Sequence, residues 1–171
     1  MNPSGHDVMF TNEMTDRLQQ LRDLRDSLPR RRECPDPEFR AKFAEAKSLG
    51  PDRTMDEFFE LVTAGLRWVK CRRCGGSGVY HRVTGPDACL GHARMGYCKN
   101  GKSLGPRERA VAKCRESAIR LADRRAQWKR LAALEPKNRW DCGSLIREME
   151  ITLRYGNSYR ATVEELRAAA A

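Results

Sequence analysis

The chain of 171 residues carries a net charge of +10 with a pI near 9.6, which favours a polyanionic partner over the role of a neutral soluble enzyme. No apolar run approaches the roughly 20 residues of a transmembrane helix, and the first ten residues lack the basic start and apolar core of a signal peptide. We therefore expect a cytoplasmic protein with no membrane partner. In that reducing compartment, clustered members of the seven cysteines are better explained as metal ligands than as disulfides.

The positive charge is concentrated in the middle of the chain. Residues 67–130 contain 17 Lys or Arg and four Asp or Glu, whereas residues 1–66 contain 10 and 13, and residues 131–171 contain six of each. Arginine binds phosphate and guanine edges through paired hydrogen bonds, and it supplies 25 of the 33 cations. A GC-rich genome would enrich arginine but would not remove acids from one segment. The central region is therefore predicted to meet the polyanion.

Residues 1–70 are predicted to form a helical N-terminal region. Leucines at helical spacing indicate a first amphipathic helix, and a second, shorter helix follows it. A third helix is predicted to begin at the capping box of Thr54 and Glu57 and to deliver the chain directly to Cys71. Its apolar face is expected to contain Phe58, Leu61, Val62, Leu66 and Val69.

Residues 71–105 are rich in glycine and show neither helical nor strand periodicity, so they are predicted to form short knuckles and turns without a core of their own. Structural zinc takes four Cys or His ligands in a tetrahedron, and a C-x-x-C turn supplies two of them. Cys71 and Cys74 form such a turn in CRRCGGSG. Cys89 and His92 follow as C-x-x-H after fourteen intervening residues, a spacing typical of the second half of a zinc site.

This pattern predicts a structural site for one zinc ion. The preferred ligands are Cys71, Cys74, Cys89 and His92. Cys98 is the alternate fourth ligand, and His81 is a more distant candidate. Protein groups then fill all four coordination positions of the zinc ion, whereas a catalytic zinc keeps one position open for water. Because Asp87 is the one acid between residues 67 and 107, no proton-shuttling Glu stands nearby, and we expect no enzyme activity.

The stretch GYCKNGKS, residues 96–103, also fits the phosphate-loop pattern G-x-x-x-x-G-K-[ST]. A phosphate loop needs a buried strand before it and a helix that begins at its Lys-Ser pair. The preceding DACLGHARM contains no run of β-forming apolar residues, and the sequence Leu104-Gly105-Pro106 interrupts the required helix. A nucleotide hydrolase is therefore disfavoured.

Residues 106–171 are predicted to begin with a basic helix of seven to eight turns that Pro106 opens. A narrow sector of this helix, at 100° per residue, contains Arg109, Lys113, Arg120 and Arg124. Two short helices broken at YGNS, residues 155–158, are expected to follow, either as a helix-turn-helix or as an ordinary helical hairpin. The predicted fold is therefore mainly α, with one small irregular zinc-knuckle module inserted between helices.

Two resemblances bear on function. CRRCGGSG resembles the C-x-x-C-x-G-x-G repeat of the DnaJ-type cysteine-rich zinc modules, of which this chain has one complete copy. The layout of helical N-terminal part, single knuckle pair and Arg-rich helical C-terminal part is similar to that of the zinc-containing Q-type late antitermination proteins of bacteriophages. The second resemblance implies a protein that loads onto promoter-proximal DNA and joins paused RNA polymerase, which then ignores terminators.

The sequence thus predicts a zinc-binding, nucleic-acid-binding transcription regulatory protein whose N-terminal helices are available to RNA polymerase. DNA is favoured over RNA because no cluster of exposed aromatic residues suggests base stacking. The expected nucleic-acid contacts are Arg72, Arg73, Arg82, Arg94, Lys99, Lys102, Arg107, Arg109, Lys113, Arg120 and Arg124. The alternative, suggested by the DnaJ resemblance, is a zinc-dependent protein-interaction or chaperone-cofactor module that does not bind nucleic acid.

Overall fold

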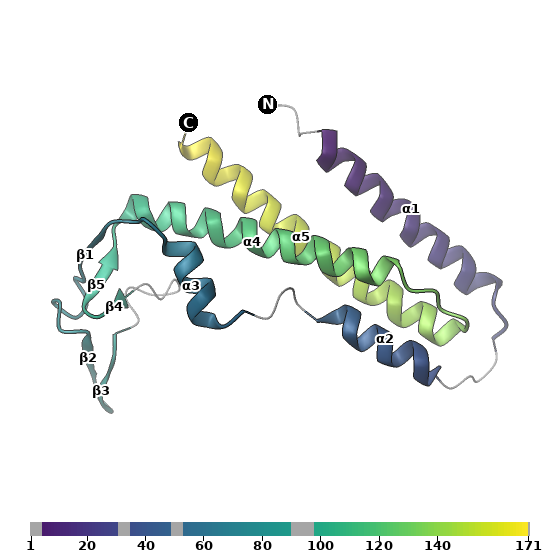
Figure 1. Cartoon of the computed structure of the whole chain (residues 1–171), viewed down its shortest axis with the longest axis horizontal. Coiled ribbons are helices and arrows are strands. Elements are labelled where there is room, and N and C mark those ends of the chain that lie inside the picture. The colour runs from purple at the N-terminus through teal and green to yellow at the C-terminus, as the bar shows by residue number, and fades with distance from the viewer. Residues whose placement is uncertain (1–4, 31–34, 49–52, 90–97, 171) are drawn as a thin grey trace. The chain divides into compact units, whose positions relative to one another are not determined.

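A computed structural model, drawn in Figure 1, describes residues 5–30, 35–48, 53–89 and 98–170. These residues fold into two compact units. The helical unit comprises Met1–Asp52 and Ile119–Ala161, and the cysteine unit comprises Arg53–Ala118 and Thr162–Ala171. Five helices and five short strands in the described residues confirm the mainly α fold, with the cysteine-rich module between helices along the chain. No helix in these ranges is both long and apolar enough to cross a membrane.

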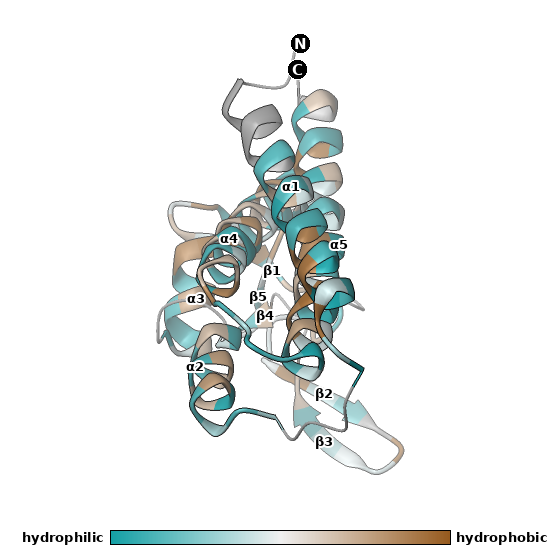
Figure 2. Ribbon diagram, turned by 90° about the vertical axis from the view of Figure 1, so that its right-hand side faces the viewer, coloured by the Kyte–Doolittle hydropathy of each residue, from teal (hydrophilic) through white to brown (hydrophobic). Residues whose placement is uncertain are grey.

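The helical unit is built from α1 (Gly5–Ser27), α2 (Pro37–Lys47), the later part of α4 (Pro106–Ala132) and most of α5 (Arg139–Ala170). Figure 2 shows hydrophobic and hydrophilic residues alternating along these helices, as amphipathic elements require. Its buried core consists of Met14, Leu18, Leu21, Phe39, Ala46, Trp128, Leu131, Leu145, Ile146 and Met149. The leucine periodicity of the first predicted helix therefore does form the core.

Polar side chains fix the helix ends in this unit. The guanidinium of Arg17 donates to the carbonyl oxygens of Ala132 at 3.0 Å and Leu134 at 2.9 Å, which satisfies carbonyls at the C-terminal end of α4. Buried Gln127 donates from Nε2 to the carbonyl oxygen of Lys47 at 2.6 Å, at the last turn of α2. These contacts fasten α1 and α2 to α4 across long sequence separations.

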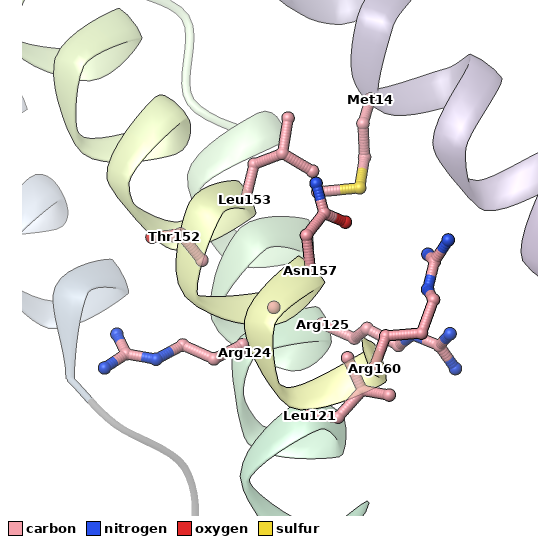
Figure 3. Close-up of a pocket in the computed structure, with 9 residues that line it drawn as sticks. Met14, Leu121, Arg124, Arg125, Thr152, Leu153, Asn157 and Arg160 are labelled. Carbon is pink, nitrogen blue, oxygen red and sulfur yellow. The ribbon is translucent and has the colours of Figure 1, made fainter. Parts of the chain in front are cut away.

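A small pocket opens between α1, α4 and α5 of the helical unit (Figure 3). Met14, Leu121 and Leu153 contribute its apolar lining, and Arg125 and Arg160 stand at its edge. Its volume of about 10 Å³ accommodates roughly one water molecule. The pocket is therefore too small for an organic substrate.

The cysteine unit contains a short helix, two small antiparallel sheets and the first turns of α4. Its elements are α3 (Met55–Thr63), β1 (Trp68–Lys70), β2 (Val79–Arg82), β3 (Gly85–Ala88), β4 (Cys98–Lys99) and β5 (Lys102–Leu104). One sheet has the strand order β1-β5-β4, and β2 pairs with β3 in a hairpin (Figure 1). Among the described residues of this unit, the buried apolar side chains other than cysteine are Val62, Leu104, Ala112 and Val163.

The capping box that opens α3 is confirmed, because the side chains and backbone amides of Thr54 and Glu57 hydrogen-bond reciprocally. The prediction that this helix continues to Cys71 is wrong. α3 ends at Thr63, and the chain turns through Gly65, whose φ of +69° is a left-handed conformation that glycine adopts without strain. Strand β1, and not a helix, leads into the cysteine turn.

Pairing between distant strands explains why the helix stops early. Trp68 lies opposite Leu104 in β5, and the centre of its ring lies 6.0 Å from the centre of the Phe59 ring on α3. Two residues that the helical pattern places on the apolar face are exposed, Leu61 by 54% and Val69 by 41%. The β-sheet partner lies more than 30 residues away, so local periodicity does not reveal it.

The predicted break at residues 155–158 is also wrong. α5 runs without interruption from Arg139 to Ala170, so neither a helix-turn-helix nor a hairpin forms there. A methyl group at Gly156 would lie 3.9 Å from Leu121 Cδ1 and 4.0 Å from Arg124 Cβ, so this glycine faces α4 and has room for a methyl group in ordinary contact. Helix-helix packing thus outweighs the helix-breaking tendency of Gly156, which amounts to about 1 kcal/mol.

Replacing Gly156 with alanine tests the uninterrupted helix. Because the new methyl group meets its neighbours at ordinary contact distance, Gly156→Ala should raise the free energy of unfolding by about 0.5–1 kcal/mol in urea denaturation. Gly143→Ala is the matched control, since Gly143 also lies in α5 with no atom within 4 Å of the added carbon. A loss of stability at Gly156 together with a gain at Gly143 would indicate a turn at YGNS.

Candidate metal centre

Four cysteine side chains converge in the cysteine unit. The sulfur atoms of Cys71, Cys74, Cys89 and Cys98 all lie within 4.8 Å of one another and could hold a metal ion. Two of the separations are 3.8 Å, between Cys71 and Cys89, and 3.9 Å, between Cys74 and Cys98. A tetrahedral ion bonded at about 2.3 Å to four thiolates sets them roughly 3.8 Å apart. The sulfur cage therefore has the size that a single ion requires.

The first half of the cage is a C-x-x-C knuckle. Backbone amides of Arg73 and Cys74 hydrogen-bond to the Cys71 sulfur, and those of Gly76 and Gly78 hydrogen-bond to the Cys74 sulfur. Gly76 and Gly78 have φ values of +92° and +78°, so glycine is needed for the chain to wrap around the sulfur. The sequence encodes this knuckle through the C-x-x-C-x-G-x-G pattern.

The second half is a β-hairpin. Cys98 opens β4, and Asn100 and Gly101 form the two-residue turn to β5 with φ values of 51° and 76°. Positive φ at both turn residues and the Asn-Gly sequence are typical of a type I′ hairpin. The hairpin and the knuckle lock together, because the amide of Cys71 donates to the carbonyl oxygen of Gly101 at 2.8 Å.

Cys89 joins the cage from the end of the β2–β3 hairpin. Its amide donates to the carbonyl oxygen of Gly78 at 2.8 Å, directly after the last register pair, Val79 with Ala88. The side chains of Cys71 and Cys89 are buried, whereas those of Cys74 and Cys98 are partly exposed. Each of the four sulfurs thus reaches the centre from a turn or a strand end that backbone hydrogen bonds hold.

The thiols of this cage differ in acidity. Burial opposes ionisation of Cys74, but the amides of Gly78 and Gly76 stabilise its thiolate and lower its pKa to about 6. The pKa of Cys71 is also lowered, since the amides of Cys74 and Arg73 outweigh the effect of burial. Burial and the neighbouring cysteines raise the pKa of Cys98 to about 12. The knuckle thus favours thiolates, and a metal ion would have to displace the proton of Cys98.

The structure brings together three of the four preferred ligands and the alternate one. Cys71, Cys74 and Cys89 meet Cys98, whereas His92 lies outside the described residues. His81 is exposed on β2, opposite Pro86, and is not a member of the cluster. The signal for Cys98 was present in the sequence, because an Asn-Gly pair two residues later predicts a hairpin rather than a loop.

The phosphate-loop resemblance of residues 96–103 disappears in the structure. Lys102 and Ser103 lie in β5, antiparallel to β1 and β4, where a phosphate loop would require the start of a helix. The helix that follows begins only at Pro106. In the described part of this motif, the Asn-Gly turn serves the cysteine hairpin.

The residues expected to contact nucleic acid are divided between the two units. Arg72, Lys102, Arg107 and Lys113 are exposed in the cysteine unit, where Arg109 is half-buried. Arg120 and Arg124 belong to the helical unit and are half-buried, with Arg124 hydrogen-bonded to Gln127 and stacked 5.0 Å from the centre of the Tyr155 ring. Arg94 lies outside the described residues, and so does the side chain of Arg82.

Two of these cations already have partners inside the cysteine unit. The guanidinium carbon of Arg73 lies 4.1 Å from the centre of the Tyr80 ring, and Lys99 forms a salt bridge with Glu60. Arg115, which the sequence did not single out, donates to the carbonyl oxygen of Ala64 at 2.6 Å and holds the C-terminal end of α3. Several cations of this segment therefore stabilise the cysteine unit through contacts within it.

Single substitutions distinguish the two candidates for the fourth ligand. Cys98→Ser should lower the zinc content of purified protein from about one equivalent to well below one, because it removes a thiolate from the cage. His92→Ala should retain the full equivalent. Cys114→Ser provides the control, since Cys114 lies on α4 outside the cluster. Retention of zinc in Cys98→Ser and its loss in His92→Ala would identify His92 as the ligand.

The close contact between the hairpin turn at Gly101 and the knuckle predicts that a larger residue at Gly101 weakens zinc binding. A methyl group at Gly101 would lie 1.9 Å from the carbonyl oxygen of Gly76, so Gly101→Ala should force the hairpin away from the knuckle. Gly75→Ala is the matched control: Gly75 also has positive φ, +59°, but no atom within 4 Å of the added carbon. Competition with a chelator should show a much weaker zinc affinity for Gly101→Ala than for Gly75→Ala, which carries only left-handed strain of about 1–2 kcal/mol. Equal affinities would contradict the locked arrangement.

No protein-family model, curated protein or solved structure matches this chain. What the four-cysteine centre does is therefore inferred from its own geometry and from the charge around it.

Proposed function

We propose that the four cysteines hold one structural zinc ion. Zinc is favoured because an all-thiolate tetrahedron suits it, and sulfur separations of 3.8 and 3.9 Å fit a single ion, whereas a multi-iron cluster needs a wider cage. With four protein ligands in place, no position is left for a reacting water, so the role of the ion is structural and not catalytic. The few buried apolar side chains of the cysteine unit support this role, since a core of that size seldom folds alone.

The cysteine unit binds nucleic acid, and one observation carries this part of the proposal: the segment that folds around the cysteines is basic and nearly free of acids. Residues 67–115 contain 12 Lys or Arg and two Asp or Glu. Exposed cations such as Arg72, Lys102 and Arg107 form no ion pair within the described residues. A zinc-stabilised, strongly cationic surface is suited to phosphate backbones, which supply most non-specific affinity.

The regulatory part of the proposal is transcription antitermination on DNA, in contact with RNA polymerase. The residues Met14, Leu18 and Leu21 of α1 are buried in the core of the helical unit. A polymerase contact through the N-terminal helices would therefore use their polar outer faces. The measurement that addresses this part is read-through of a terminator by purified RNA polymerase on a template that carries the cognate promoter.

Salt dependence tests the nucleic-acid part. Zinc-loaded protein should bind a labelled DNA duplex, and a plot of log affinity against log salt concentration should fall with a slope of roughly −4 or steeper, which corresponds to about four or more phosphate contacts. Removal of zinc with a chelator should abolish this binding, because the cationic surface loses its support. Absence of binding at low salt would refute the proposal and would favour a module that contacts only proteins.

A further inference from the structure

A row of three lysines crosses the β1-β5-β4 sheet. The antiparallel register places Lys70 on β1 opposite Lys102 on β5, and Lys102 opposite Lys99 on β4. Residues directly opposite in a sheet project from the same face, with Cβ atoms about 5 Å apart. Lys70, Lys102 and Lys99, the lysine row, therefore project from one face of the sheet, and all three are exposed.

The metal centre and the turn beside it set this row. Lys70 immediately precedes Cys71, and Lys99 immediately follows Cys98, so two members adjoin proposed zinc ligands. The Asn100-Gly101 turn then brings Lys102 opposite Lys99. The sequence alone does not reveal the row, because Lys70 is separated from Lys99 and Lys102 by more than 25 residues.

The charges of the lysine row are not all explained by the stability of the fold. Lys99 is neutralised by Glu60, and its Nζ lies 5.7 Å from the centre of the Phe59 ring. In the part of the chain that the structure describes, neither Lys70 nor Lys102 has an acidic partner. Like charges directly opposite one another destabilise a sheet. Lysine often protects edge strands against unwanted pairing, but that reason does not apply to Lys102, which lies on the central strand.

We propose that the lysine row is the main phosphate-binding surface of the cysteine unit, and that it lies along the backbone of a DNA duplex. This inference rests on the proposed function and names the surface that performs it. The backbone positions of the row form a line across the sheet that spans two strand spacings, roughly 10 Å, which matches about three base-pair rises of 3.4 Å. A free phosphate ion would instead call for donors that converge from several sides.

The test compares two double variants that lose the same charge. Lys70→Gln with Lys102→Gln removes the two unpaired members of the row. Arg147→Gln with Arg154→Gln, the control, removes two exposed arginines from α5 in the helical unit. Both zinc-loaded proteins are titrated with the same labelled duplex over a range of salt concentrations, and zinc content near one equivalent verifies that the cysteine unit is folded.

The inference predicts that the magnitude of the salt slope falls by about two in the lysine variant and stays unchanged in the control. Should the double variant lose zinc, Lys102→Gln alone serves, with an expected fall of about one. Relief of repulsion should also leave the melting temperature of the lysine variant at low salt equal to or above that of wild type. Wild-type slopes in the lysine variant would overturn the lysine row and leave nucleic-acid binding standing. A wild-type protein that does not bind DNA would instead overturn the proposed function itself.

Discussion

The cysteine unit depends on the meeting of four sulfur atoms within 4.8 Å of one another. These atoms come from a knuckle, from the end of one hairpin and from the start of another, and few apolar side chains hold those pieces together. Without a cation, the thiols of Cys71 and Cys74, whose pKa values are lowered, would lie next to two further thiols, those of Cys89 and Cys98, in a small, partly buried volume. A bound divalent ion would neutralise the thiolates and fix the geometry at once, which explains how a segment without a core of its own can keep one conformation.

The four-cysteine centre also determines where positive charge lies on the cysteine unit. Glycine and cysteine provide the turns, so the remaining positions of the segment are available for cations that project outward. The register that aligns Lys70, Lys102 and Lys99 depends on β1, which immediately precedes Cys71, and on β4, which begins with Cys98. In the proposed function, binding of zinc would therefore also align the lysines that contact phosphate.

Features of short range were predictable from the sequence. The first amphipathic helix, the capping box at Thr54 and the helix from Pro106 follow from periodicity and terminal residues, and the structure has all three. The C-x-x-C-x-G-x-G pattern likewise identified Cys71 and Cys74, because the knuckle is built from consecutive residues. In these cases the residues that decide the structure lie within a few positions of one another.

Features that depend on distant partners were missed. The helix expected to reach Cys71 gave way to β1 because β5, more than 30 residues later, pairs with it. Gly156 suggested a break, but this residue faces α4, and α5 packs against that helix without interruption. The symmetry of C-x-x-C and C-x-x-H favoured His92, whereas the Asn-Gly turn after Cys98 carries the competing signal for a hairpin that brings that sulfur to the cage.

X-ray absorption spectroscopy of the zinc-loaded protein tests the central claim most directly, because it counts the atoms bound to the ion without altering the chain. Four sulfur atoms at about 2.3 Å, with no nitrogen in the coordination sphere, are the predicted result. Three sulfurs with one nitrogen at about 2.0 Å, or a bound water in the fourth position, would contradict a closed four-cysteine structural centre.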